Sequence, residues 1–180
     1  IPYADASSPV GPPAQTLQEF EAKNNEIYSS HLGINSWAAL QSTTPIHAVI
    51  DDDEVANDLA GGALASSDPR FAGPGTYVND TTLFRNAVTA FEQYNAMQTK
   101  VYSGTGDPRF DGKPDLYRYD IHGSDAAIIM VDTRTFRDAE LPEPSPIDSL
   151  QTLEAAFNPT RTILGETQLS RLEHDLVDAQ

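Results

Sequence analysis

Thr44-Pro45-Ile46-His47-Ala48-Val49-Ile50-Asp51-Asp52-Asp53-Glu54-Val55-Ala56-Asn57-Asp58 is the stretch from which we predict the fold of the chain. Its β-branched, apolar part, Ile46 to Ile50, is typical of a buried strand. Four consecutive acids follow, and such acids repel one another unless they spread into water or converge on a cation. Because α/β proteins carry their chemistry just beyond the carboxyl ends of strands, this position favours a metal site over a solvated acidic turn.

The composition indicates a single acidic domain over residues 1–180. The net charge is −16, and only three of the 11 basic residues are lysines. This charge argues against nucleic acid as a partner, because phosphate backbones are bound by Lys and Arg. The chain has no cysteine and no apolar run long enough to span a membrane. Its 13 Pro and 11 Gly residues predict long loops between few regular elements.

The N-terminal part predicts a loop followed by a helix. The first fourteen residues are rich in Pro, Ser and Gly, which indicates an extended arm. Thr16 and Glu19 then form a capping box, so we expect a helix from this point to about His31. Trp37 and Leu40 indicate a short helical turn after it.

Two further helices are predicted from their start signals and apolar stripes. Asp80 is the expected N-cap of an amphipathic helix from Thr81 to about Thr99. The last helix is expected to open at Gly165, with Gln168 reaching back as a capping partner. Its predicted core stripe consists of Leu169, Leu172 and Leu176.

Two strands are predicted between these helices, from Leu116 to Ile121 and from Ala126 to Asp132. The first alternates in polarity, as a half-exposed strand would, whereas the second is apolar on both faces and is therefore expected to be central in a sheet. Asp132 then ends a buried strand, as Asp51 does. A short helical piece is expected near residues 150–157, within a Pro-rich segment.

Three blocks of the sequence resemble one known family. Residues 50–58, Ile-Asp-Asp-Asp-Glu-Val-Ala-Asn-Asp, are similar to the Asp-Asp-His-Glu-Val-x-Asn-Asp signature of the alkaline phosphatase D (PhoD-like) type of metallophosphatase. Residues 117–138, with Tyr-Arg-Tyr and Ile-Ile-Met-Val-Asp-Thr-Arg-Thr-Phe-Arg-Asp, and residues 162–169, Thr-Ile-Leu-Gly-Glu-Thr-Gln-Leu, follow in the family's order. The resemblance covers nearly the whole chain.

The resemblance implies an α/β fold with calcineurin-like α/β/β/α layers, incomplete in this chain, and hydrolysis of phosphate esters. It implies a cluster of metal ions, calcium and iron in the family, with manganese or magnesium as alternatives. Asp52 matches a metal-ligating acid of the family. Hard cations take oxygen ligands and lower the pKa of a bound water, which then attacks phosphorus.

The sequence departs from the family pattern at three points. Asp53 stands where the family has a histidine that protonates the leaving group, and an ionised aspartate cannot donate that proton unless burial keeps it neutral. The Gly-Asp-x-x-Tyr motif of the family is expected at or before residue 1, and the late histidine ligands beyond Gln180. We therefore expect the chain to be the middle of a phosphatase domain.

Each candidate acid has a structural alternative. In such a turn Asp51 can be a metal ligand or, more commonly, a cap of backbone N–H groups. Asn57 can be a ligand through its amide oxygen or the N-cap of the following segment, and Asp58 is expected to be a cap. Asp53 is the candidate catalytic residue, and its alternative is a surface replacement in an inactive chain.

Arg134 and Arg137 directly follow the second predicted strand and are the candidate substrate-binding residues. A guanidinium group can bind two phosphate oxygens at once. In a chain this acidic, the favoured alternative is an ion pair with Asp132, Asp138 or the acid run. His47 is expected to be a core or interface histidine, and His122 a surface residue.

The predicted function is metal-dependent hydrolysis of phosphomonoesters or phosphodiesters by metal-activated water. The alternatives are a noncatalytic module whose acids at 51–58 bind calcium structurally, or a pseudoenzyme. The expected partner is a small phosphate ester, with self-association through exposed strand edges. The acidic, lysine-poor composition favours an extracellular or periplasmic location, with the cytoplasm as the alternative.

Overall fold

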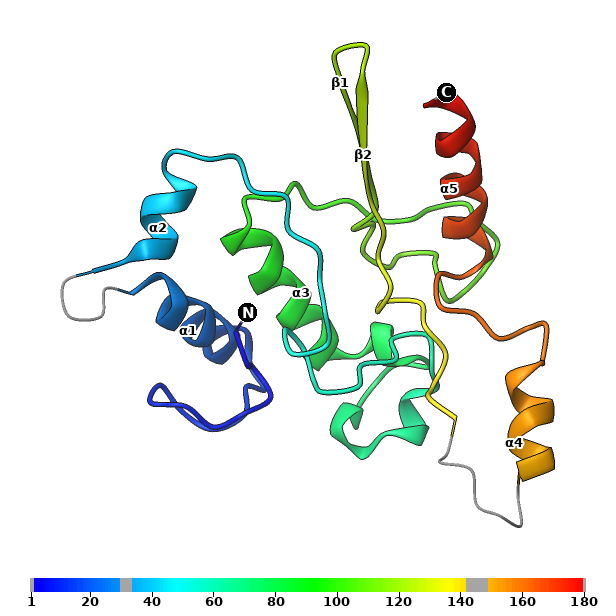
Figure 1. Cartoon of the computed structure of the whole chain (residues 1–180). Coiled ribbons are helices and arrows are strands. Elements are labelled where there is room, and N and C mark those ends of the chain that lie inside the picture. The colour runs from blue at the N-terminus through cyan, green and yellow to red at the C-terminus, as the bar shows by residue number, and fades with distance from the viewer. Residues whose placement is uncertain (1, 30–33, 142–148, 180) are drawn as a thin grey trace.

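The computed structural model describes residues 2–29, 34–141 and 149–179, and its elements form three groups (Figure 1). Helices α1 (Leu17–Tyr28), α2 (Ser36–Gln41) and α3 (Thr82–Tyr94) lie on one side. Strands β1 (Arg118–His122) and β2 (Ala126–Met130) project from the middle, and α4 (Ser149–Ala156) and α5 (Glu166–Asp178) lie on the other side. Short 3-10 helices span Ala65–Ser67, Pro69–Phe71 and Val78–Asp80.

Helix α1 begins at the predicted capping box. The Thr16 side chain accepts a hydrogen bond from the Glu19 N–H, and the Glu19 carboxylate accepts one from the Thr16 N–H at 2.8 Å. The helix ends at Tyr28, before the predicted end, and His31 lies outside the described residues. Helix α2 confirms the helical turn predicted around Trp37.

Helix α3 confirms the second predicted helix but is shorter at both ends. Its N-cap is Thr81, whose hydroxyl accepts a hydrogen bond from the Phe84 N–H, so the prediction of Asp80 as the cap was wrong. Asp80 instead accepts a hydrogen bond from Lys113 Nζ at 3.0 Å. The helix ends at Tyr94 because Ala96 has a φ of 51°, a left-handed conformation that terminates helices.

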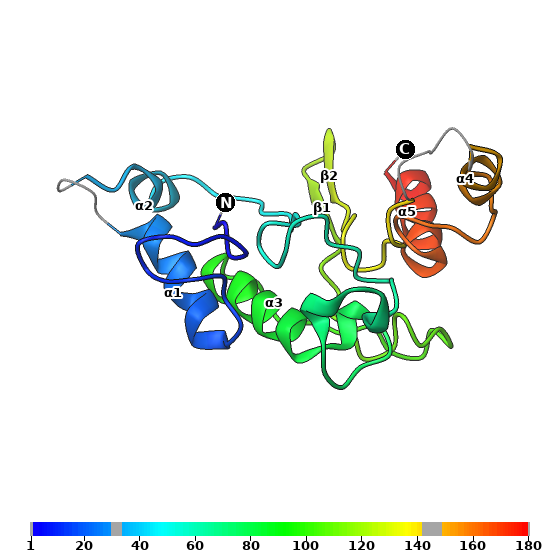
Figure 2. The ribbon, with the colours of Figure 1, turned by 90° about the horizontal axis from the view of Figure 1, so that it is seen from below.

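Helices α1 and α3 pack side by side and enclose the larger apolar core (Figure 2). Phe20 of α1 and Phe84 of α3 are fully buried, and burial of such a side chain contributes roughly 1.5–3 kcal/mol. Ile50, Val55 and Leu59, on either side of the acid run, belong to the same core. The acids are therefore anchored on this core by their apolar neighbours.

The segment 46–50 is irregular in the structure, so the predicted buried strand was wrong. Val49 and His47 are exposed, and of the predicted strand residues only Ile50 is buried. The Ala48 carbonyl accepts a hydrogen bond from the Arg118 guanidinium group. A β-branched run becomes a strand only when another strand pairs with its backbone, and within the described ranges none pairs with this one.

Strands β1 and β2 form an antiparallel hairpin, in which Arg118 lies opposite Met130 and His122 opposite Ala126. The predicted pair of strands is confirmed, but the central position of β2 was wrong. Among the described residues the sheet has two strands, and β2 is exposed near the turn and buried only at Met130. An apolar strand can thus lie outside the core over most of its length when only the residue farthest from the turn is buried.

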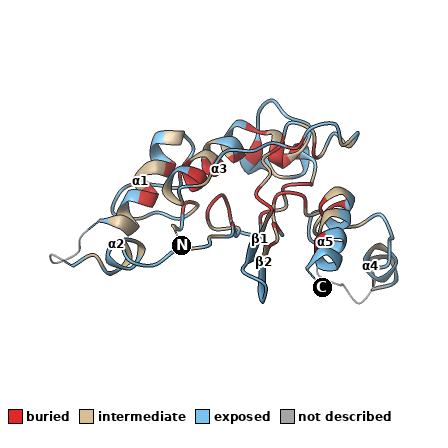
Figure 3. Cartoon of the chain, turned by 90° about the horizontal axis from the view of Figure 1, so that it is seen from above, coloured by how far each residue is buried: buried red, intermediate tan, exposed pale blue. Residues whose placement is uncertain are grey.

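The combination of helices with a small antiparallel sheet is compatible with the α/β class. The α/β/β/α layering remains a prediction. Figure 3 shows the buried residues gathered between α1 and α3 and around the base of the hairpin, whereas α4 and most of α5 are exposed. In the part of the chain that the structure describes, no helix has the length and apolar character needed to cross a membrane.

Helix α5 presents a polar face to the rest of the chain. Gln168 and Asp175 are its buried residues, whereas Leu169 and Leu176 are 44% and 50% exposed, so the predicted core stripe was wrong. Gln168 is no capping partner either, because the Gly165 N–H donates to Thr162 Oγ1 and Gln168 Oε1 accepts from the Asp132 N–H. The helical periodicity correctly identified the apolar face of α5. The face that packs against the rest of the chain is instead the polar one.

Ion pairs and hydrogen bonds hold this polar face. Arg171 Nη1 lies 2.9 Å from Asp115 Oδ2, and the Arg171 guanidinium lies 4.5 Å from the centre of the Tyr117 ring. The Tyr117 hydroxyl donates to Asp175 Oδ2 at 2.9 Å. These contacts join α5 to the segment that leads into β1.

Candidate functional site

Residues 51–58, here called the acidic turn, are folded back on themselves by backbone hydrogen bonds. The Asp52 carbonyl accepts from the N–H groups of Val55 and Ala56, at 2.8 and 2.7 Å. The Glu54 carboxylate accepts from the Asp51 N–H at 2.8 Å. The turn therefore has a fixed backbone, and its carboxylates do not simply spread into water.

Asp52 is the carboxylate that organises the turn. Its Oδ1 accepts from the Asp53 N–H and its Oδ2 from the Asp58 N–H, both at 3.0 Å. Asp58 has a φ of 57°, a conformation that Asp tolerates better than most residues. Capping of backbone N–H groups, the structural alternative given for Asp51, is thus carried out by Asp52.

The N-terminal arm closes over the acidic turn. The Ala4 N–H donates to the Asp53 carbonyl at 2.9 Å, and the Asn57 N–H donates to Asp5 Oδ2 at 2.7 Å. Buried Lys23 of α1 ties the arm down, because its ammonium group donates to the carbonyls of Ala6 and Gly11. Sequence reasoning missed Asp5, since nothing in an irregular arm indicates which distant backbone group a side chain will meet.

Arg134 connects the acidic turn to the segment after β2. Its Nε and Nη2 lie 2.7 and 2.6 Å from Asp51 Oδ1, and Nη2 lies 3.4 Å from Asp52 Oδ2. The ion pair with the acid run, favoured for Arg134 from the sequence, is confirmed. The guanidinium side chain is 17% exposed, so one edge remains open to solvent.

Buried Asp132 positions Arg134. Its Oδ1 accepts from the N–H groups of Arg134 and Thr135, at 3.0 and 2.9 Å. Gln168 of α5 pairs with the Asp132 backbone, accepting from its N–H at 2.9 Å and donating to its carbonyl at 2.8 Å. Burial raises the pKa of Asp132, although the two N–H groups partly offset this effect.

Gly61 and Gly62 allow the chain after the acidic turn to approach the Arg134 segment. A Cβ atom at Gly61 would lie 2.3 Å from the Thr135 carbonyl oxygen, and one at Gly62 would lie 2.4 Å from that of Phe136. The Gly61 N–H donates to the Arg134 carbonyl at 2.9 Å. The Gly-Gly pair is too short to indicate a phosphate loop. Its lack of side chains is the sequence feature that permits this close approach of two backbone segments.

Arg137 lies elsewhere in the same segment. It lines a hollow together with Asp138 and Arg161, and within the described ranges no hydrogen bond or ion pair joins its guanidinium group to the acidic turn. The structure thus brings Arg134, Asp51 and Asp52 together and leaves Arg137 apart.

Asp53 differs from its neighbours in the turn. In the described part of the chain its carboxylate has neither a hydrogen bond nor an ion pair, while its backbone is held at both the N–H and the carbonyl. Burial, followed by the charges of Asp52 and Asp5, raises the pKa of Asp53 above its usual value, and Arg134 opposes the shift. A carboxyl group of this kind is suited to proton transfer.

The predicted ligands fit a metal ion poorly as they are arranged. Asp51 Oδ1 faces Arg134, and both oxygens of Asp52 accept backbone N–H groups. The Asn57 amide donates to Asp58 Oδ2 at 2.6 Å. Among the described residues, no three acidic or histidine side chains form a group that could hold a metal ion. We therefore derive no chemical step through a metal.

The comparison with known families adds a separate line of argument. The model of the PhoD-like phosphatase family matches residues 5–180. The chain belongs to this family. The match confirms the resemblance found in the three sequence blocks, and it supports phosphate ester hydrolysis as the activity class of this PhoD-like phosphatase. Searches of curated proteins and of solved structures each found no match.

Among the described residues of this PhoD-like phosphatase, no hydrogen bond or ion pair joins a histidine to the acidic turn. His47 and His122 are exposed, with ring centres 6.1 Å apart and planes nearly perpendicular. His47 is therefore no core residue, because the strand that was to bury it does not form. The side chain of His174 is 80% exposed on α5.

Proposed function

We propose that this PhoD-like phosphatase hydrolyses phosphate monoesters or diesters and that Asp53 protonates the leaving group. The observation that supports this role is the unpaired Asp53 carboxyl group, whose pKa is raised by burial and by the neighbouring carboxylates. A carboxyl group can act as a general acid only in its neutral form, and a raised pKa extends the pH range in which that form is present. The bound backbone of Asp53 would hold the acid in place.

Arg134 and Arg137 are the proposed substrate-binding residues. Arg134 now shares its charge between Asp51 and Asp52, and a phosphate group with several anionic oxygens would compete for the same guanidinium edge. Arg137 lies three residues further along the same segment. It would bind the ester from the hollow that it lines with Asp138 and Arg161. An anionic substrate would need a cation beside it to offset the field of a chain with a net charge of −16.

Metal dependence is proposed on the family resemblance, with calcium and iron as the metals and manganese or magnesium as substitutes. Asp51, Asp52 and Asn57 are the proposed ligands. To bind a metal ion, Asp51 would first have to break its contact with Arg134. Asp52 would have to break its hydrogen bonds to backbone N–H groups. An acidic, lysine-poor surface supports an extracellular or periplasmic location, and self-association also remains a proposal.

Hydrolysis of two esters with different leaving groups tests the role of Asp53. An alkyl phosphate needs a proton on its departing oxygen, whereas p-nitrophenolate leaves as a stable anion. Asp53→Asn is therefore expected to slow the alkyl ester about 100-fold and the p-nitrophenyl ester much less. Asp125→Asn, in the exposed hairpin turn, is the matched control. Equal effects on both esters would remove Asp53 from the role of acid.

Two further measurements separate the alternatives. Asp53→His introduces the residue of the family signature and is expected to raise activity. The melting temperature is then followed with calcium, iron and manganese, using Asp52→Asn as the variant that removes the central carboxylate. A shift without turnover would favour the noncatalytic calcium module, and neither shift nor turnover would favour a pseudoenzyme.

A further inference from the structure

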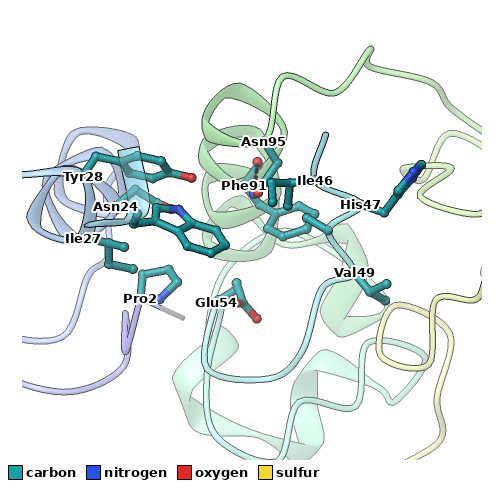
Figure 4. A pocket seen from close by; sticks show the side chains of 12 residues that line it. Pro2, Asn24, Ile27, Tyr28, Ile46, His47, Val49, Glu54, Phe91 and Asn95 are labelled. Atoms are coloured by element: carbon teal, nitrogen blue, oxygen red, sulfur yellow. Dashed lines mark hydrogen bonds between the residues drawn. The ribbon is translucent and has the colours of Figure 1, made fainter. Parts of the chain in front are cut away.

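A pocket of about 330 Å³ lies between the three N-terminal helices and the loop that enters the acidic turn. Figure 4 shows Tyr28 and Asn24 reaching it from α1, Phe91 and Asn95 from α3, and Glu54 from the loop. The proposed hydrolysis makes no use of this pocket. Its walls come from five separate segments, because Pro2 of the N-terminal arm also lines it, so its shape depends on the folded chain.

Most of the lining is apolar or aromatic. Tyr28, Trp37 and Phe91 supply three rings from three different helices, and Ile27 and Ile46 add aliphatic surface. The Tyr28 hydroxyl donates to the Tyr94 carbonyl at 3.0 Å, which fixes the ring at the wall. Such a lining accommodates an apolar group, and aromatic faces also attract a cation.

The polar groups of the pocket are biased toward acceptors. Asn24 donates its amide to the Phe20 carbonyl, and Asn95 donates its amide to the Phe91 carbonyl, both at 2.9 Å. Each side chain therefore uses an N–H group on its own helix and keeps its amide oxygen as the atom with unused capacity. A ligand that donates hydrogen bonds would be recognised here.

Glu54 supplies a negative charge to the lining of the pocket. Its side chain lines the pocket and is only 7% exposed, with Oε2 accepting from the Asp51 N–H and Oε1 available as a further acceptor. An ammonium group placed beside this carboxylate would form an ion pair with it. No Lys or Arg is among the described residues that line the pocket. His47 also lines the pocket, but its ring points away from Glu54 (Figure 4), so an anionic ligand would meet the carboxylate without a cation beside it.

We propose that this pocket binds a protonated primary amine that carries an aromatic or aliphatic body. The ammonium group donates to Glu54 and to the amide oxygens of Asn24 and Asn95, and the body packs against the rings. Phosphate and other anions are excluded by the same groups. The inference is independent of the proposed hydrolysis, since it requires no turnover and no metal.

Trp37 provides a local readout, because it is the only tryptophan in the chain and it lines the pocket. Its fluorescence is titrated with three ligands of matched shape: 2-phenylethylamine, 2-phenylethanol and phenylacetate. The amine is expected to bind at least 10-fold more tightly than the alcohol, and phenylacetate more weakly still. Equal binding of amine and alcohol, tighter binding of the carboxylate, or no response to the amine would each overturn the proposal.

The Glu54→Gln variant tests the source of selectivity. It keeps an acceptor for the Asp51 N–H, and it is expected to weaken amine binding about 10-fold while leaving 2-phenylethanol unchanged. Glu173→Gln, on the exposed side of α5 and outside the pocket, is the matched control. Unchanged amine affinity in Glu54→Gln would overturn the role of the carboxylate. The ligand comparison on the natural chain remains decisive if this variant does not fold.

Discussion

Replacing Gln168 with Leu tests whether α5 is held to the rest of the chain by hydrogen bonds. Gln168 is fully buried, and its amide joins the N–H and carbonyl groups of Asp132 at 2.9 and 2.8 Å. Leu has a similar size but can neither accept nor donate. The substitution would therefore leave two buried backbone groups without partners.

The expected cost follows from those two groups. An unsatisfied buried donor or acceptor costs roughly 1–3 kcal/mol, so the pair gives a loss of about 2–6 kcal/mol. The third bond, from the Gln168 amide to the Leu164 carbonyl at 3.1 Å, would add to this loss. Against a typical total of about 5–15 kcal/mol, the change in unfolding free energy would be large.

Urea unfolding, followed by circular dichroism, measures the difference. Gln93→Leu is the matched control, because Gln93 lies exposed on α3 and the same substitution there removes no buried partner. A loss below about 1 kcal/mol for Gln168→Leu, equal to that of the control, would refute the reasoning. It would mean that water or a rearranged helix satisfies the Asp132 backbone.

Three other substitutions probe the cap, the ion pair and a buried tyrosine. Thr81→Ala removes the α3 cap and should lower the free energy of unfolding in urea by about 1–2 kcal/mol. Thr82→Ala, at an exposed position, is the control and should change it by about zero. Equal effects of the two substitutions would contradict the capping role. Arg134→Ala should cost about 1 kcal/mol or less, because the Asp51 side chain is 52% exposed, and the loss should shrink in high salt; a salt-independent loss would argue against the ion pair. Burial, together with the bond to Asp175, raises the pKa of Tyr117 to about 12, so its contribution is present below about pH 10 and is lost as the pH rises toward 12. Tyr117→Phe should therefore reduce the pH dependence of stability in that range, and an unchanged dependence would refute the assignment.

The elements that the sequence predicted correctly are those fixed by local interactions. The capping box of Thr16 and Glu19 acts within one helical turn, and the hairpin needs only its two strands and the three residues between them. Such signals are contained in a short window of sequence. They do not depend on which distant segment packs nearby.

The errors share a different origin. Ile46–Ile50 has the composition of a strand, but a strand also needs a partner that no local pattern specifies. The leucines of α5 form a regular stripe. The helix nevertheless packs through Gln168 and Asp175, because these side chains accept hydrogen bonds from the Asp132 N–H and the Tyr117 hydroxyl. A pattern of apolar residues identifies an amphipathic element and leaves open which of its faces meets the chain.

The candidate site was predictable in position but not in its internal pairing. The acids at 51–58 and the arginine after the second strand were found from sequence, and the structure joins them through the contact between Arg134 and Asp51. The contributions of Asp5 and Gln168 could not be found in this way. Both act on backbone groups more than 30 positions away, where neither periodicity nor motif spacing carries information.

The pairing within the acidic turn singles out one carboxyl group. Asp51 is paired with Arg134, Asp52 caps two N–H groups, and Glu54 caps a third. Asp53 has no such contact within the described ranges, and the charges of its paired neighbours raise its pKa further. Among the described residues, the partners that stabilise the turn thus leave the Asp53 carboxyl group without a partner of its own, and this supports testing Asp53 first.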